Sequence, residues 1–226
     1  MNYLAHGHRF TDRPYFLAGT ALPDWLSVVD RKIRLRQRHL APHATGDGSL
    51  AAELAAGVLQ HLHDDAWFHS TPAFYLVSGA IGKRLRGLLI DPDDHRPGFL
   101  GHILTEILLD SHLEARHPTA VGGYYAAIDQ VDASEVARFV AQFTDQPVEG
   151  LAKFIPLFQR ERILPDYADS ARLCHRLNQV LRRVKLPSLE PAVIPVLDWA
   201  RELVGGQVDA LLQPPTDSPN DRPEQS

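Results

Sequence analysis

The segment SLAAELAAGVLQHLHDDAWFHS, residues 49–70, decides the fold class. Its apolar side chains recur every four residues, which is the spacing that places them on one face of a helix. They are Leu50, Leu54, Val58, Leu62 and Ala66. Ser49 precedes the first of them, and a serine at this position caps the free N–H groups of a first turn. The pattern predicts a helix over residues 49–70.

Prolines and turn residues divide the rest of the chain into further segments with helical periodicity. Helices are expected at residues 73–89, 97–116, 119–130, 133–144, 147–162, 166–184 and 190–212. The alternation of apolar and polar residues that is typical of strands is absent. We therefore expect one all-α, helical-bundle domain of about eight to ten helices over residues 1–212.

Three other segments carry less periodic sequence. Residues 11–30 contain Pro14, Gly19 and Pro23, which predict two short helical pieces, with Asp24 at the start of the second. Residues 31–49 are basic at first and then typical of a loop. Residues 213–226 are rich in proline and lack large apolar side chains, so a disordered tail is expected there.

Composition excludes several classes of protein. The 226 residues carry a net charge of -5, which gives no reason to expect nucleic-acid binding. The single cysteine, Cys174, excludes an intrachain disulfide and a structural zinc site built from cysteines. No run of about 18 apolar residues indicates a transmembrane segment, and the amino terminus lacks the pattern of a signal peptide, so a cytoplasmic location is expected.

Histidines are concentrated in the first half of the chain. Eleven of the 12 lie between His6 and His117. Two motifs share one spacing, His61-x3-Asp65-x3-His69 and His102-x3-Glu106-x3-Asp110. Residues four apart drift by only about 40 degrees around a helix axis, so each motif forms a stripe facing one cavity. Two such stripes predict a metal site between two packed central helices.

Burial supports the same interpretation. Imidazoles and carboxylates on largely apolar helices would cost several kcal/mol in desolvation, which a bound cation offsets. A single His-Asp pair at this spacing is usually a surface ion pair, and the recurrence of the motif argues against that alternative. Imidazole with carboxylate suits transition metals, so one or two ions of Mn, Zn or Fe are expected.

Further motifs carry a resemblance to known families. The chain opens with Met1-Asn2-Tyr3-Leu4-Ala5-His6, continues with Gly19-x4-Asp24, and contains Gly57-x3-His61-x3-Asp65 with Pro72 following. Over roughly its first half it resembles the acyl carrier protein phosphodiesterase family. Those enzymes are all-helical, manganese-dependent relatives of the HD hydrolases. His69, His102 and Glu106 stand where that family has Asp, and these residues make the chain similar to the zinc-dependent phospholipase C and nuclease group.

Both resemblances imply one set of metal ligands. It comprises His6, Asp24, His61, Asp65, His69, His102 and Glu106, with Asp110 as an additional candidate. The contiguous pair His63-Asp64 is similar to that of HD hydrolases, and His63 is expected on the substrate side. The N-terminal tryptophan of the secreted phospholipases is missing.

The expected activity is hydrolysis of a phosphate ester by a water that a metal ion activates. Asp110 is the expected acceptor of its proton. Arg34 and Arg36 are expected to hold the substrate phosphate or an acidic partner such as acyl carrier protein. Two alternatives remain open, a non-catalytic helical metal-binding or scaffold protein and a phospholipase C-like hydrolase.

Overall fold

A computed structural model describes residues 1–89 and 95–214 of the chain, and all regular elements among them are helical. The single domain contains twelve described α-helices, more than the eight to ten expected. They are α1 Tyr3–Gly7, α2 Pro14–Val29, α3 Gln37–Leu40, α4 Leu50–Phe68, α5 Pro72–Arg86, α7 Pro97–Arg116, α8 Ala120–Ile128, α9 Ala133–Ala141, α10 Glu149–Glu161, α11 Ser170–Arg183, α12 Ile194–Gly205 and α13 Val208–Leu211. Three 3-10 helices, η1 Ala41–His43, η2 Leu164–Ala168 and η3 Pro191–Val193, connect them.

The helix expected at residues 49–70 is confirmed as α4, and the Ser49 side chain accepts a hydrogen bond from the Ala52 amide at 3.3 Å. The helix expected at 97–116 is confirmed as α7 with the same bounds. The segment at 190–212 is divided into η3, α12 and α13 instead of one helix. Short helices α1, α3 and η1 occur where the sequence predicted none.

The prediction of two helical pieces over residues 11–30 is wrong, because α2 is one helix with Pro23 inside it. Asp24 therefore lies in the helix interior and not at a helix start. A proline ring inside a helix clashes with the carbonyl four residues earlier. Here that residue is Gly19, which packs directly against α4, and these tertiary contacts outweigh the local preference of the proline to end a helix.

Two pairs of helices cross at glycines. In the pair α2–α4, a β-carbon on Gly57 would overlap the Phe16 carbonyl oxygen and approach the Gly19 Cα to 2.9 Å. In the pair α5–α7, a β-carbon on Gly101 would approach the amide nitrogen of Gly82 to 2.9 Å. Such contacts leave no room for a side chain, so backbone lies directly on backbone at both crossings.

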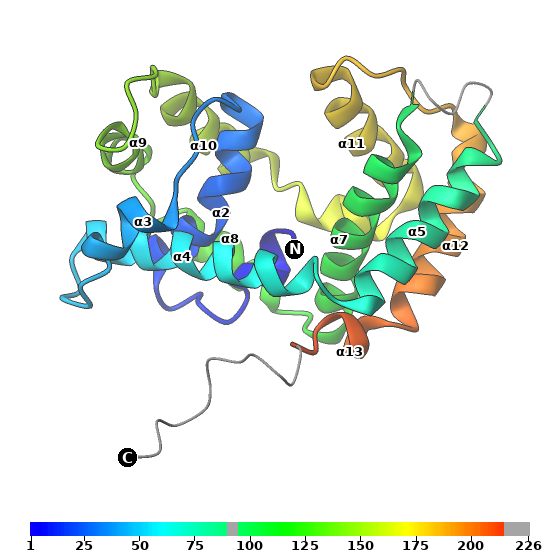
Figure 1. Ribbon diagram of the computed structural model, residues 1–226, viewed down its shortest axis with the longest axis horizontal. Coiled ribbons are helices and arrows are strands. Elements are labelled where there is room, and N and C mark those ends of the chain that lie inside the picture. Colours follow the sequence, from blue (N-terminus) through cyan, green and yellow to red (C-terminus); the bar gives the residue numbers. More distant parts are fainter. Residues whose placement is uncertain (90–94, 215–226) are drawn as a thin grey trace.

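The amino terminus lies near the centre of the molecule, between α2 and α7 (Figure 1). The short helix α1 contacts α2, α4 and α7 and so joins the two helix pairs. The second half of the chain packs around them, with α10 against α2 and α12 against α5 and α7. Residues 215–226 of the expected disordered tail lie outside the described residues. None of the described helices is long and apolar enough to cross a membrane.

The α2–α4 crossing generates a stability prediction. Replacing Gly57 by Ala forces a methyl group into the α2 backbone, so we expect a loss of about 1–3 kcal/mol in the free energy of unfolding. Gly79 is the matched control, since it lies on α5 with no atom within 4 Å of an added β-carbon. Gly79→Ala should stabilise by about 0.5–1 kcal/mol. Urea denaturation measures both, and equal effects of the two changes would contradict the tight crossing.

Candidate metal centre

The first group of potential ligands consists of His6 from α1 with His61 and Asp65 from α4, and their ligand atoms lie within 4.8 Å of one another. His6 Nε2 is 3.3 Å from Asp65 Oδ1, and His61 Nε2 is 3.4 Å from Asp65 Oδ2. The two imidazole rings stack with their centroids 4.2 Å apart. Both histidines are buried, so the group is largely removed from water.

Hydrogen bonds at Nδ1 orient both imidazoles of this group. His61 Nδ1 donates to the Thr20 carbonyl at 2.8 Å, and His6 Nδ1 lies 3.3 Å from Asp64 Oδ2. Gln60 donates to the other Asp64 oxygen at 2.9 Å. When Nδ1 carries the proton, Nε2 keeps its lone pair for a cation, which is the usual arrangement of metal-binding histidines. Asp64, which the sequence marked as part of the contiguous His63-Asp64 pair, thus supports the ligand His6 from behind.

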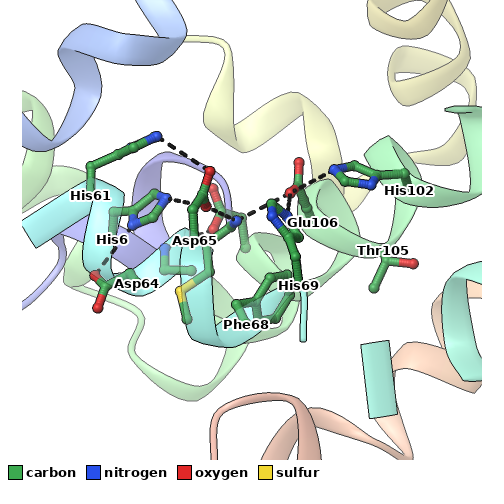
Figure 2. Close-up of polar contacts among 12 residues, drawn as sticks. His6, His61, Asp64, Asp65, Phe68, His69, His102, Thr105 and Glu106 are labelled. Atoms are coloured by element: carbon green, nitrogen blue, oxygen red, sulfur yellow. Dashed lines mark hydrogen bonds and ion pairs between the residues drawn. The ribbon is translucent and has the colours of Figure 1, made fainter. Parts of the chain in front are cut away.

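The second group consists of His69, which follows the last residue of α4, with His102 and Glu106 from α7. Glu106 Oε1 lies 2.8 Å from His69 Nε2 and 3.3 Å from His102 Nε2 (Figure 2). The ring of Phe74 packs against both imidazoles, with centroid distances of 4.8 and 4.9 Å. These three ligand atoms also lie within 4.8 Å of one another, and the group is only partly buried.

A buried ammonium connects the two groups. The amino group of Met1 is 2.7 Å from Asp65 Oδ1 and 3.1 Å from Glu106 Oε1. Figure 2 shows His6 and His61 on the side of Asp65, and His69 and His102 on the side of Glu106. The two carboxylates therefore converge on a point that already holds a positive charge.

The carboxylates of the two groups are strongly held in their ionised form. Burial alone would raise the pKa of Asp65, but hydrogen bonds from His6 and His61 outweigh it and hold the pKa far below its usual range. Burial likewise opposes ionisation of Glu106, and the Met1 ammonium with His102 and His69 lowers its pKa to about 2. Both groups therefore present anionic oxygen to a cation at neutral pH.

One buried polar atom at the centre, Asp24 Oδ2, has no hydrogen-bond partner, and His6 Nε2 approaches only Asp65 Oδ1, at 3.3 Å. Unpartnered buried polar atoms are rare because they lose their hydration without compensation. Asp24 lies close enough to His61 and His6 for their charges to lower its pKa, although burial dominates and leaves that pKa raised. The two imidazoles and one carboxylate of each group are the donor set that a divalent transition metal prefers, so the residues present fit a metal ion.

The structure changes the expected division of the ligands. His61, Asp65 and His69 do not face one cavity, because His69 joins Glu106 while the other two join His6. The two helices that carry the motifs were expected to pack against each other, and the structure shows a different packing. The helix α4 packs mainly against α2, α7 packs mainly against α5, and α1 lies between them. Asp24 lies beside these groups but belongs to neither of them.

Asp110 has a different environment from the one expected for a base. Its two oxygens accept the backbone N–H groups of Leu4 and Ala5, both at 2.8 Å, and its side chain is buried. Burial raises its pKa to about 7, against the effect of these two hydrogen bonds. Asp110 thereby fixes the first turn of α1, and we no longer assign it the role of proton acceptor.

The predicted substrate-binding residues lie in two different places. Arg34 and Arg36 line a cavity that is described below. His63 is exposed on α4 and lines none of the principal cavities among the described residues. The structure thus leaves His63 without a contact to the centre.

The centre borders a cavity of about 830 Å³. Asp24, His102 and Glu106 contribute to its wall. The opposite wall comes from the second half of the chain, with apolar side chains of α10, such as Phe154 and Phe158, and polar side chains of α11. A concave, mostly apolar space with a few convergent polar groups is the usual form of a small-molecule site.

Comparison with protein-family models, with curated proteins and with solved structures found no match to this chain.

The first group generates a prediction about protons. The pKa of His6 is raised to about 9, because hydrogen bonds to Asp64 and Asp65 outweigh the burial that would lower it. The proton on His6 therefore stabilises the metal-free fold below pH 6.5, and this contribution is lost as the pH rises through 9. A metal ion must displace that proton. At pH 7.5 we expect the binding of a metal ion to release about one proton from His6.

Calorimetric titration of zinc in buffers of different ionisation enthalpy measures this release. His6→Gln should release about one proton fewer than the wild type. His8 is the matched control, because it follows α1 and belongs to neither group. His8→Gln should release the same number as the wild type, and an unchanged release in His6→Gln would contradict the assignment of His6.

Proposed function

We propose that this protein is a metal-dependent phosphoric-ester hydrolase whose centre is formed by the two histidine and carboxylate groups. One observation carries the proposal. Asp65 and Glu106, each flanked by two imidazoles, converge on a single buried ammonium beside a cavity large enough for a small organic molecule. Two imidazoles and one carboxylate leave coordination positions open, which is typical of catalytic and not of structural metal sites.

Each group is suited to one divalent transition-metal ion, Mn, Zn or Fe, and the two adjacent groups are suited to a pair. A bound ion supplies a Lewis acid that lowers the pKa of water and neutralises charge developing on phosphoryl oxygens. The contribution of the chain is to orient the ligands. Thr20 and Asp64 fix the imidazoles of the first group, and Phe74 restricts those of the second.

We assign the proton-accepting role to Asp24 in place of Asp110. Its Oδ2 has no hydrogen-bond partner, and the residue lines the cavity together with Glu106 and His102. Burial raises its pKa from the usual range of a carboxyl group, which brings its basicity closer to that required near neutral pH. We infer that Asp24 accepts the proton of a water molecule in the cavity.

The resemblance to the acyl carrier protein phosphodiesterases directs the choice of physiological substrate. The phosphodiester that links phosphopantetheine to acyl carrier protein is the first such substrate to test. A synthetic phosphodiester, bis-p-nitrophenyl phosphate, tests the chemistry without assuming that partner.

The central experiment compares His61→Ala with His63→Ala, two changes on the same helix. His61 contributes a ligand atom to the first group, whereas His63 is exposed. We expect His61→Ala to lose about one ion per chain and to reduce turnover of bis-p-nitrophenyl phosphate at least about 100-fold. His63→Ala should retain both. Mass spectrometry measures the metal content of protein purified without an affinity tag, and absorbance measures turnover after addition of Zn, Mn or Fe.

The outcomes separate the proposal from its rivals. Stoichiometric metal without turnover of either substrate would favour a non-catalytic metal-binding protein. Turnover of phospholipid in place of both substrates would favour a phospholipase C-like hydrolase. Absence of metal under all loading conditions would overturn the metal centre itself.

A separate prediction concerns Asp24. Asn has nearly the shape of Asp but cannot accept the proton, so Asp24→Asn should lower kcat by about 100-fold or more. Its metal content should remain that of the wild type, because Asp24 belongs to neither group of ligand atoms. Steady-state kinetics and metal analysis on the same preparation test this, and loss of metal in step with kcat would instead identify Asp24 as a ligand.

A further inference from the structure

A second cavity, of about 640 Å³, adjoins the one at the metal centre. The two cavities share five lining residues, which are Ser27, Phe99, Ile103, Val180 and Arg183. Four arginines contribute to the wall of the second cavity, which are Arg31, Arg34, Arg36 and Arg183. No aspartate or glutamate lines it among the described residues. The second cavity therefore has a positively charged wall although the chain as a whole is acidic.

These four guanidinium groups make no ion pair and no hydrogen bond within the described part of the chain. Several arginines elsewhere are paired with carboxylates, as Arg13 is with Glu53 at 2.8 Å and Arg176 with Asp166 at 2.7 Å. Partial burial, followed by the nearby charge of Arg31, lowers the pKa of Arg183. The charges of Arg31 and Arg183 are thus close enough to repel each other, and no carboxylate of the described residues forms an ion pair with any of the four arginines.

Backbone conformation explains how the arginines converge. Residues 33–36 have no regular secondary structure, and buried side chains alternate with exposed ones along them. Ile33 and Leu35 are buried, which anchors the segment and leaves Arg34 and Arg36 exposed. Arg183 reaches the same cavity from the last residue of α11, 147 positions after Arg36. The fold, and not the local run of basic residues, brings the fourth arginine to this site.

We propose that the cavity lined by Arg31, Arg34, Arg36 and Arg183 is a subsite for a second phosphate or diphosphate group of the substrate. The assignment rests on the proposed function, because the neighbouring cavity would hold the ester bond to be hydrolysed. Guanidinium groups bind phosphate oxygens through paired, charge-assisted hydrogen bonds. A concave site of this volume suits a compact anion that several arginines contact together. The substrate class is therefore a phosphate ester that carries an additional phosphate.

A binding experiment tests the subsite independently of catalysis. Inorganic pyrophosphate is titrated calorimetrically into full-length protein that has been freed of metal on a chelating resin, in a buffer without phosphate. Under these conditions the two ligand groups hold no metal ion that could bind the probe. Arg183→Gln is compared with Arg182→Gln, which removes the same charge from the neighbouring position of α11 but lines neither cavity.

Loss of one arginine from the site should weaken pyrophosphate binding about tenfold or more, since a hydrogen bond to a charged group contributes at least that factor. We expect this loss in Arg183→Gln and less than about a twofold change in Arg182→Gln. Absence of binding to the wild type would overturn the subsite. Equal weakening in the two variants would also overturn it, because it would show a general effect of surface charge.

A kinetic comparison tests whether the subsite serves the substrate. Deoxythymidine 5′-(p-nitrophenyl phosphate) and its 3′-phosphorylated form differ by one phosphate. With metal-loaded wild type and Arg182→Gln, the added phosphate should raise kcat/KM about tenfold, and in Arg183→Gln it should have little effect. An equal kcat/KM for both compounds in the wild type would overturn the role in substrate binding. Failure of all turnover, with pyrophosphate binding intact, would instead overturn the hydrolase and support the anion site.

Discussion

The contact between Gly19 on α2 and Gly57 on α4 is the constraint on which the centre depends. Their backbones approach so closely that neither position has room for a β-carbon. The residue after Gly19 is Thr20, whose carbonyl accepts the Nδ1 hydrogen of His61. One turn after Gly57 comes His61 itself. A wider crossing would separate these two atoms, and the His61 imidazole would lose the hydrogen bond that directs its Nε2 toward Asp65.

A second constraint places α1 in the core. A helix of five residues is too short to be stable alone, and here both oxygens of Asp110 accept its Leu4 and Ala5 amides. This contact holds His6 against His61 and directs the Met1 amine to Asp65 and Glu106. The burial of Asp110 raises its pKa to about 7, so the anchor is built from a carboxylate in an unfavourable environment. The amides of α1 supply the donors that make this burial tolerable.

Periodicity in the sequence predicted the principal helices and the histidine–carboxylate pairs within them. His61 with Asp65, and His102 with Glu106, are four residues apart on α4 and α7, so helix geometry alone brings each pair together. The division of the ligands between two groups could not be predicted from the sequence, because it depends on where α1 lies between α4 and α7.

The same dependence on tertiary contacts explains the other differences between expectation and structure. Pro23 has a strong local preference for a helix start, yet packing at Gly19 keeps α2 continuous. The spacing of Asp110 is that of a ligand, but its partners are amides about 105 positions away. Asp64 and His63 are adjacent in sequence on α4, and only Asp64 faces His6, because neighbouring residues of a helix point about 100 degrees apart.

The charges around the two cavities determine the order in which the groups of a substrate would bind. The cavity at the centre is lined by carboxylates, among them Asp24 and Glu106, as well as by arginines, whereas the second cavity is lined by arginines and by no carboxylate of the described residues. Under the proposed function, a substrate with two phosphates would therefore bind first through its second phosphate in the arginine cavity, before its ester is bound at the centre.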